Sequence, residues 1–309
     1  MDKYKYRITE CAKVAEFAEK LNLETLYDGD REEISFSNMN INRPGLFLTG
    51  YSELFAFDRI QIIGQAETAY VSRMTAAERS AAFEKLFAYE LPCLVVSTNL
   101  DVFPEILTAA KKYKRPVFRS HKVTSLIFND LVVYLNDLLA PTESRHGVLV
   151  DIYGVGVMLT GDSGIGKSET ALELVQRGHR LVADDSVIIK YINDRLVCTS
   201  PPIIRYFMEV RGIGIVDVRS MYGVGAIKLT KVLDLVVEME QWDNAKAYDR
   251  LGLTNETVEI LGVKIPKIVL PVKPGRNLAA LLEVAARNHR LKSLGYNSAA
   301  ELDKRVTFK

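Results

Sequence analysis

Residues 161–168 read GDSGIGKS and match the pattern G-x-x-x-x-G-K-[ST]. Glycines in this pattern let backbone N–H groups turn toward an anion, and the following helix adds the partial positive charge of its N-terminus. An apolar run over residues 154–160 precedes the segment, and a helical pattern over residues 169–176 follows it. A strand before the loop and a helix after it are the required context, so the pattern predicts binding of nucleotide phosphates.

Each residue of this segment is a candidate for phosphate binding. Lys167 can bridge the outer two phosphates as a mobile positive charge, and the hydroxyl of Ser168 can complete a magnesium shell. The candidate phosphate-binding residues are Gly161, Asp162, Ser163, Gly164, Ile165, Gly166, Lys167 and Ser168.

Two adjacent carboxylates are the strongest candidates for activating an acceptor oxygen. Asp184 and Asp185 close an apolar segment about one helix after the loop, where a returning strand would bring its C-terminal end toward the phosphates. A magnesium ion would offset their like charges, and the two could divide metal binding and proton transfer. The alternative is a helix cap or turn made by two acids. His146 directly precedes another strand pattern; alone it fits a surface or capping role, and it gains meaning only beside the acids.

Three further charged residues lie downstream. Glu209 belongs to the segment MEVRGIGIVDV, whose G-x-G lacks the following helix of a dinucleotide fingerprint. Arg250 and Arg276 lie in loops that contain Gly or Pro, where a cation that stabilises phosphate could be held. For each arginine taken separately, a solvated surface position is an equally good interpretation.

The composition limits the class of protein. A length of 309 residues suits two domains, and 40 Lys and Arg against 39 Asp and Glu argue against a bulk nucleic-acid or membrane-surface binder. Cys11, Cys93 and Cys198 lack the spacing of a zinc site or disulfide framework and are expected to be small buried apolar residues. Without a membrane-spanning run or signal-peptide pattern, the sequence predicts a cytoplasmic protein.

The elements of the first half indicate a small α/β domain. A Thr-x-x-Glu capping box at Thr75 opens a helix toward Tyr89, and a helical pattern over 123–140 stops at the polar breaker 141–144. Other helices are expected at 10–20 and 104–114, with strands at 59–64, 92–97 and 116–120. The predicted domains are residues 1–130, of unclear role, a connecting helix or linker at 131–140, and a catalytic domain at 141–309.

The second half is rich in strand patterns. A hairpin is predicted to turn at Asn193-Asp194. The expected strands are 146–154, 155–161, 186–191, 195–199, 226–239 and 258–272, followed by helices at 277–291 and 297–306.

The motifs taken together resemble the HPr kinase/phosphorylase family of bacteria. The matching segments, in order, are HGVLVDIYG, GDSGIGKSET, VADD, MEVRGIGIVDVRSMYGVGAI, YDRLG and PVKPGRN. They cover the second domain; the first also looks like the family's N-terminal domain, without a comparable motif. The resemblance implies an enzyme that uses ATP and Mg²⁺ to phosphorylate a serine of the phosphocarrier protein HPr. It also implies removal of that phosphate by inorganic phosphate, which releases pyrophosphate, and a regulatory role in carbon catabolite repression.

The same resemblance implies the fold and the site roles. It implies a C-terminal P-loop domain with a mixed sheet, similar to the nucleotide-binding core of phosphoenolpyruvate carboxykinase, and a homohexamer that responds to fructose 1,6-bisphosphate at a site the sequence does not locate. Asp185, beside Asp184, matches the proton acceptor, although the chain alone leaves open which of the two is the base. His146 matches the residue that assists it, Lys167 and Ser168 the phosphate and magnesium contacts, Glu209 a second magnesium contact, and Arg250 a catalytic arginine. A loop tied to dephosphorylation is matched by Pro271, Val272, Lys273, Pro274, Gly275 and Arg276.

Two other functions compete with this interpretation. One is another P-loop enzyme, such as a small-molecule kinase or a carboxykinase-like protein, against which the ordered motifs count. The other is a nucleotide-binding switch without transfer activity. A guanine-reading NKxD segment and a basic helix-turn-helix cluster are both missing from the sequence, so we expect neither such a switch nor a nucleic-acid partner.

Overall fold

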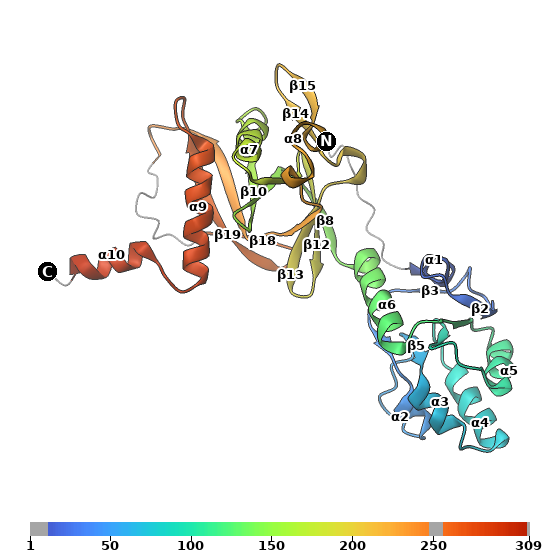
Figure 1. Ribbon diagram of the computed structural model, residues 1–309. Helices are drawn as coiled ribbons and strands as arrows, with labels where there is room; N and C mark the ends of the chain where they lie inside the picture. The colour runs from blue at the N-terminus through green and yellow to red at the C-terminus, as the bar shows by residue number, and fades with distance from the viewer. Residues whose placement is uncertain (1–11, 247–255, 308–309) are drawn as a thin grey trace. The chain divides into compact units, whose positions relative to one another are not determined.

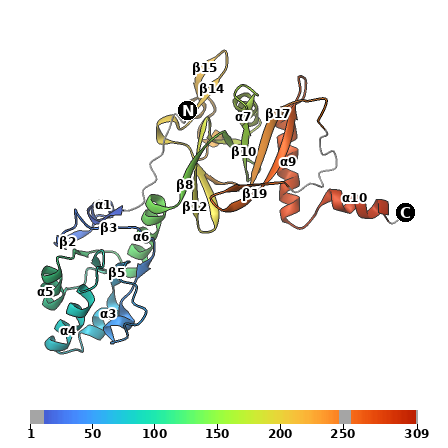
Figure 2. The same ribbon diagram turned by 180° about the vertical axis from the view of Figure 1, so that it is seen from behind.

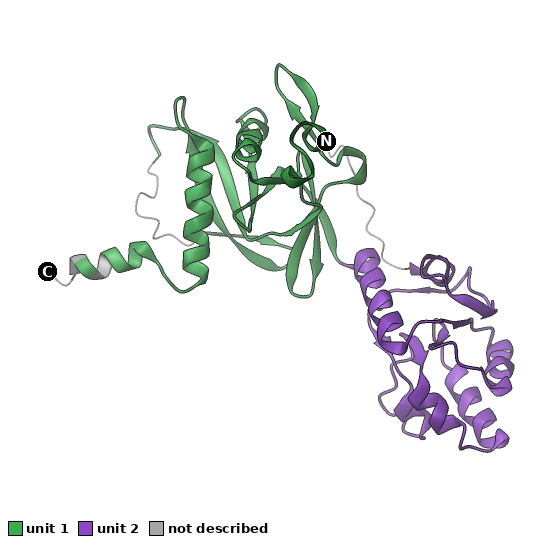
Figure 3. Ribbon diagram, viewed as in Figure 1, with its two compact units in different colours: residues 1–7, 141–309 green, residues 8–140 purple. Residues whose placement is uncertain are grey.

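The computed structural model describes residues 12–246 and 256–307 (Figure 1). These residues form two compact units that divide between Ala140 and Pro141 (Figure 3). Each unit contains both helices and strands, so the predicted mixed α/β class is confirmed. Among the described residues, every helix is too short or too polar to span a lipid bilayer.

The N-terminal unit is built on a five-stranded sheet of order β2-β7-β6-β5-β4. The four strands from β4 to β7 are mutually parallel, and β2 is an antiparallel edge. Helices α2 to α5 pack on one face of the sheet, while α1 and α6 pack on the other. The strands are β1 (Ala12–Lys13), β2 (Glu24–Tyr27), β3 (Ser35–Phe36), β4 (Ile41–Asn42), β5 (Ile60–Ile63), β6 (Leu94–Val96) and β7 (Val117–Arg119), and the helices are α1 (Val14–Lys20), α2 (Gly45–Leu48), α3 (Gln65–Val71), α4 (Ala76–Phe87), α5 (Pro104–Tyr113) and α6 (Thr124–Leu139).

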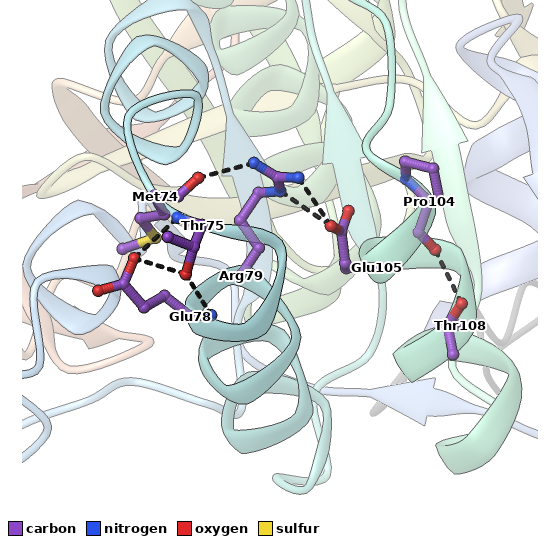
Figure 4. Close-up of polar contacts among 7 residues, drawn as sticks. All are labelled: Met74, Thr75, Glu78, Arg79, Pro104, Glu105 and Thr108. Carbon is purple, nitrogen blue, oxygen red and sulfur yellow. Dashed lines mark hydrogen bonds and ion pairs between the residues drawn. The ribbon is translucent and has the colours of Figure 1, made fainter.

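The predicted capping box begins α4, as Figure 4 shows. The Thr75 hydroxyl accepts a hydrogen bond from the Glu78 amide at 3.3 Å, and the Glu78 carboxylate accepts one from the Thr75 amide at 2.7 Å. Arg79, one residue later, donates to the Glu105 carboxylate of α5 at 3.0 Å and to a backbone carbonyl at 2.8 Å. The beginning of α4 is therefore fixed both locally and to the neighbouring helix.

Helix α6 contains residues 131–139 of the expected linker. Ile127, Leu131 and Leu135 on this helix are fully buried in the core of the N-terminal unit. The helix therefore belongs to that core. It ends at Leu139, where the sequence predicted its end, and Thr142–His146 then forms strand β8.

The C-terminal unit contains a six-stranded mixed sheet of order β11-β9-β10-β17-β19-β18 and a four-stranded sheet of order β16-β13-β12-β8. One face of the larger sheet is covered by α7, α8 and α9, and the other packs against the smaller sheet. The strands are β8 (Thr142–His146), β9 (Val148–Ile152), β10 (Val155–Gly161), β11 (Arg180–Ala183), β12 (Ser186–Ile192), β13 (Arg195–Thr199), β14 (Phe207–Val210), β15 (Gly214–Asp217), β16 (Thr230–Val232), β17 (Leu235–Gln241), β18 (Thr257–Ile260) and β19 (Val263–Val272). The helices are α7 (Lys167–Gln176), α8 (Val218–Tyr222), α9 (Leu278–Ser293) and α10 (Ser298–Thr307), with 3-10 turns at Pro202–Ile204 and Val224–Ala226.

Local turn chemistry explains the predicted hairpin between β12 and β13. Asn193 and Asp194 have φ values of 49° and 59°, the left-handed region that these two residue types tolerate best among non-glycines. Strand pairing then continues from Ile192 opposite Arg195. The hairpin is confirmed. Cys93 and Cys198 are buried, as expected, whereas Cys11 lies outside the described residues.

Candidate active site

The segment 161–168 connects β10 to α7, seen from opposite sides in Figures 1 and 2. Gly164 and Gly166 have φ values of 86° and 100°, which a side chain would strain. At Gly161, an added Cβ would lie only 2.1 Å from the carbonyl oxygen of Met239 on the adjacent strand. Ile165 is buried in the core and anchors the loop. The three glycines are therefore required by the backbone path.

Lys167 brings its ammonium group back over the loop. Its Nζ donates to the carbonyl oxygens of Gly161 at 2.8 Å and Asp162 at 2.9 Å. The residue is only 7% exposed, and burial lowers its pKa against the opposing pull of Asp184 and the other nearby carboxylates. The loop thus holds a largely desolvated cation, whose attraction for an anion is stronger than that of a solvated lysine.

Two chain crossings between the sheets build the other side of the site. The chain passes from β8 to β9 at Gly147 and from β11 to β12 at Asp184-Asp185. The Gly147 amide donates to the Asp185 carbonyl at 3.2 Å, and His146 pairs with Ser186 across β8 and β12. Because β11 and β10 each pair antiparallel with β9, they end at the same edge of the large sheet. This edge brings the acids and His146 to the loop.

The two adjacent acids occupy different environments. Asp184 is 4% exposed and accepts hydrogen bonds from the Ser168 hydroxyl at 2.9 Å and the Glu209 amide at 3.1 Å. Burial raises the pKa of Asp184 to about 6, although these hydrogen bonds oppose the shift. The Asp185 side chain is half exposed and lies 3.1 Å from Nδ1 of His146. Its φ of 66° is a left-handed conformation that turns the two side chains apart.

The hairpin of β14 and β15 closes the site with a residue to which the sequence analysis gave no role. Arg211 donates to the Ser163 hydroxyl of the loop at 3.2 Å, and a Cβ at Gly164 would lie 2.3 Å from the Arg211 guanidinium. The residue stands two positions after Glu209 in the segment MEVRGIGIVDV. Arg211 lies in the turn that follows β14, and its nearness to Glu209 in the sequence is a signal that could have marked it as a candidate.

A pocket of about 100 Å³ joins these groups. The predicted site residues that line it are His146, Ser163, Gly164, Gly166, Lys167, Ser168, Asp184, Asp185 and Glu209. Arg211 and Glu169 also line it. Nine predicted residues from four separate segments therefore meet in one small polar cavity.

The predicted dephosphorylation loop begins with the last two residues of β19, Pro271 and Val272, continues beyond the strand, and does not line this pocket. Gly161, Met239 and Leu270 lie at one level across the parallel strands β10, β17 and β19. Residues 273–276 therefore leave the sheet at the same edge as the segment 161–168. Within it, Arg276 donates to the Pro271 carbonyl at 2.9 Å. Arg250 lies outside the described residues.

The side-chain oxygens of this pocket fit a Mg²⁺ ion that is held partly by substrate phosphates. They do not fit a metal ion that is enclosed by protein ligands alone. In the described ranges, no three His, Cys, Asp or Glu side chains are grouped closely enough to hold a metal by themselves. Mg²⁺ is usually bound by one or two protein oxygens together with substrate phosphates and water. Ser168 and Glu209, both beside Asp184, provide such a partial donor set at the mouth of the loop.

Comparisons with known proteins match one family over nearly the whole described chain. Two family models match: "HPr Serine kinase N terminus" over residues 12–135 and "HPr Serine kinase C-terminal domain" over residues 137–306. The chain is 49% identical over 287 residues to the HPr kinase/phosphorylase of Caldanaerobacter subterraneus subsp. tengcongensis, covering 93% of this chain and 94% of that protein. It is 50% identical to the protein of that name from Peptoclostridium acidaminophilum, covering 93% of each chain.

A solved structure, that of the Hpr(Ser) kinase/phosphatase from Coxiella burnetii, is 37% identical with a TM-score of 0.48, covering 52% of this chain and 98% of that chain. The two family matches, and the alignment of 93% of the chain with relatives that are 49% and 50% identical in sequence, show the family membership. The chain belongs to the HPr kinase/phosphorylase family.

Proposed function

We propose that this protein transfers a phosphoryl group from ATP to a serine of HPr and removes it again by phosphorolysis, which yields pyrophosphate. The names of the relatives supply the substrate and the two directions. The observation that carries the proposal is the single pocket in which the Lys167 loop meets the contact between Asp185 and His146. A phosphate site and a proton acceptor at one place are the minimum that both directions need.

The phosphate end of the reaction belongs to the segment 161–168. We assign it as a P-loop whose backbone amides hold the β-phosphate, and we expect this unit to share its core with phosphoenolpyruvate carboxykinase. Lys167 can exchange the carbonyl oxygens of Gly161 and Asp162 for phosphate oxygens. Arg211, which contacts Ser163, provides a second positive charge at the loop.

The acceptor end belongs to Asp185. In the forward step, the serine oxygen attacks the γ-phosphorus, the new P–O bond forms as the bond to the β-phosphate oxygen breaks, and Asp185 takes the hydroxyl proton. His146 fixes the orientation of this carboxylate through the contact at 3.1 Å. The half-exposed position of Asp185 suits a group that must meet a protein side chain entering from outside.

The second direction uses the same groups in reverse. Inorganic phosphate, held in the loop where the β-phosphate had been, attacks the phosphorus of phosphoserine. The bond to the serine oxygen breaks, Asp185 returns a proton to that oxygen, and pyrophosphate leaves. One anion site therefore serves both directions.

We assign Ser168 and Glu209 as the residues that hold Mg²⁺, with Asp184 positioning both through its hydrogen bonds. The bound ion would neutralise charge on the phosphate oxygens and so assist transfer. Burial of Asp184 disfavours its ionised form, and a cation bound at this place would stabilise that form.

Mass spectrometry of HPr incubated with the protein and Mg-ATP tests the proposal. A gain of one phosphoryl group on a serine supports the kinase, and release of pyrophosphate from phosphoserine-HPr with inorganic phosphate supports the phosphorylase. ATP turnover with unmodified HPr would instead indicate a small-molecule kinase, and nucleotide binding without turnover a switch. We also expect a homohexamer, which light scattering after size-exclusion chromatography checks.

A further inference from the structure

A second pocket lies in the N-terminal unit, and none of its lining residues belongs to the site assigned to phosphoryl transfer. Its volume is about 500 Å³, within the range of pockets that bind small molecules. Its lining comes from the segments that follow each of the four parallel strands: Arg43 after β4, Gln65 after β5, Thr98 after β6, and Val123, Thr124 and Ser125 after β7. The pocket therefore lies at the carboxyl edge of this sheet.

The path of the chain explains why this edge is open. Helix α3, which follows β5, packs on one face of the sheet, and α6, which follows β7, packs on the other. Connections that diverge to opposite faces leave a crevice outside the carboxyl ends of the strands, which is where open α/β sheets bind ligands.

Hydrogen bonds between the loops fix the floor of the pocket. The Thr98 amide donates to the Lys122 carbonyl at 2.7 Å, which ties the segment after β6 to the segment after β7. The hydroxyls of the fully buried Ser97 and of Thr124 are 2.7 Å apart. Gly64 allows the segment after β5 to approach, since a Cβ there would lie 2.3 Å from the Thr124 hydroxyl. The pocket is thus preformed rather than a gap between loose loops.

The charge of the lining favours an anion. Arg43 is the one charged side chain among the residues that line the pocket. Its Nη2 is held at 2.7 Å by Glu67, which is buried behind it and also accepts the Gly64 amide at 3.0 Å. Glu67 thereby positions the guanidinium, and the remaining N–H groups of Arg43 have no partner among the described residues. A guanidinium held at one corner can still bind a phosphate with its other donors.

The beginning of α6 supplies further donors beside Arg43. This helix runs for 16 residues and no side chain caps its first turn. Thr124 and Ser125 contribute hydroxyls and lie at the positive end of the helix. Next to these polar groups, Val123 and Phe128 are 48% and 37% exposed and form an apolar wall.

We propose that this pocket binds a small phosphorylated metabolite, with its phosphate between Arg43 and the beginning of α6 and the rest of the molecule against Val123 and Phe128. The inference goes beyond the proposed function, since none of these residues belongs to the phosphoryl-transfer site. It gives the N-terminal unit a ligand-binding task.

Calorimetry with the full chain tests the proposal. Lys167→Ala is used as the background, so that binding at the catalytic loop is weakened. The probes are AMP and glucose 6-phosphate, with adenosine and glucose as their counterparts without phosphate. We expect at least one phosphorylated probe to bind and its counterpart to bind at least about tenfold more weakly, because the phosphate supplies the charged contacts.

Ser125→Glu locates the binding. Ser125 is exposed, and a carboxylate at this second helical position suits the helix but repels a phosphate. Ala77→Glu is the matched control, since it places the same charge at the same exposed position of α4, away from the pocket. We expect Ser125→Glu to weaken binding about tenfold or more and Ala77→Glu to leave it unchanged. If neither phosphorylated probe binds, or if both variants alter binding equally, the proposal is wrong.

Discussion

Nδ1 of His146 lies 3.1 Å from Oδ1 of Asp185, and the backbone holds the two residues together through the hydrogen bond from the Gly147 amide to the Asp185 carbonyl. The neighbouring Asp184 turns instead toward the Ser168 hydroxyl, 2.9 Å away. One pair of adjacent acids thus serves both sides of the site. This difference is the basis on which we propose Asp185 for proton transfer and Asp184 for orienting the groups assigned to Mg²⁺.

Asp185→Asn should lose turnover far more than nucleotide affinity. The amide preserves the shape of the side chain but cannot take a proton, so we expect kcat for HPr phosphorylation to fall by about 10²- to 10⁴-fold. The dissociation constant of Mg-ATP, measured by calorimetry, should stay within about twofold, because Asp185 lies outside the phosphate loop. A collapse of ATP affinity would instead identify Asp185 chiefly as a metal ligand.

Asp184→Asn is the matched comparison at the adjacent residue. Its expected effect is weaker binding of Mg-ATP, since the acceptor that orients Ser168 and the Glu209 amide loses its charge. A titration of ATP binding against magnesium concentration checks this. Unchanged magnesium dependence would contradict the assigned division of labour.

His146→Asn should reduce turnover only through Asp185. We expect a loss of about tenfold or more in kcat/KM for the single variant, and no further loss when it is combined with Asp185→Asn, because residues that act as one unit are not additive. Steady-state kinetics of the two single variants and the double variant measure the coupling. Additive losses would show that His146 acts independently.

Lys167→Ala should abolish both directions of the reaction. Each direction needs the same anion site, and the buried ammonium group is the principal fixed charge of the loop. Phosphorylation of HPr and pyrophosphate release from phosphoserine-HPr are assayed side by side. Substantial phosphorolysis by this variant would mean that inorganic phosphate binds elsewhere.

Local signals predicted much of the fold. Three predictions depend on neighbouring residues only, and the structure confirms them: the strand before and the helix after the glycine-rich segment 161–168, the Asn193-Asp194 turn and the Thr75 capping box. The two-residue strands β1, β3 and β4 were missed, because so short a segment has no periodicity of its own.

Contacts between residues that lie far apart in the sequence are the part of the site that the sequence did not predict. The contact between His146 and Asp185 depends on how β8 and β12 pair, and the contact of Arg211 with Ser163 depends on where the β14 and β15 hairpin lies. Neither relationship is encoded in residue spacing. The burial of Leu131 and Leu135 in the core of the N-terminal unit is non-local too, since it arises from packing against a sheet whose strands lie earlier in the chain.

Thr75→Ala should destabilise the beginning of α4. Loss of the N-cap costs about 1 kcal/mol, which would increase hydrogen exchange of the α4 amides about fivefold. Thr108→Ala is the control on the adjacent helix α5, because the Thr108 hydroxyl donates only to the Pro104 carbonyl within its own helix (Figure 4). Exchange measured by mass spectrometry should respond to the first change and not to the second. Equal exchange in both variants would show that Arg79 alone fixes this helix end.

Arg276→Ala should impair dephosphorylation more than phosphorylation. Residues 273–276 leave the sheet at the same edge as the segment 161–168, and Arg276 is held by its hydrogen bond to the Pro271 carbonyl. ATP can bind through its adenosine and all of its phosphates. The binding of free inorganic phosphate has fewer contacts to draw on and therefore depends more on each cation near the segment 161–168. We therefore expect the rate of pyrophosphate release to fall about tenfold or more while HPr phosphorylation changes by less than about threefold. Equal losses in both directions for Arg276→Ala would assign this arginine to the common anion site instead.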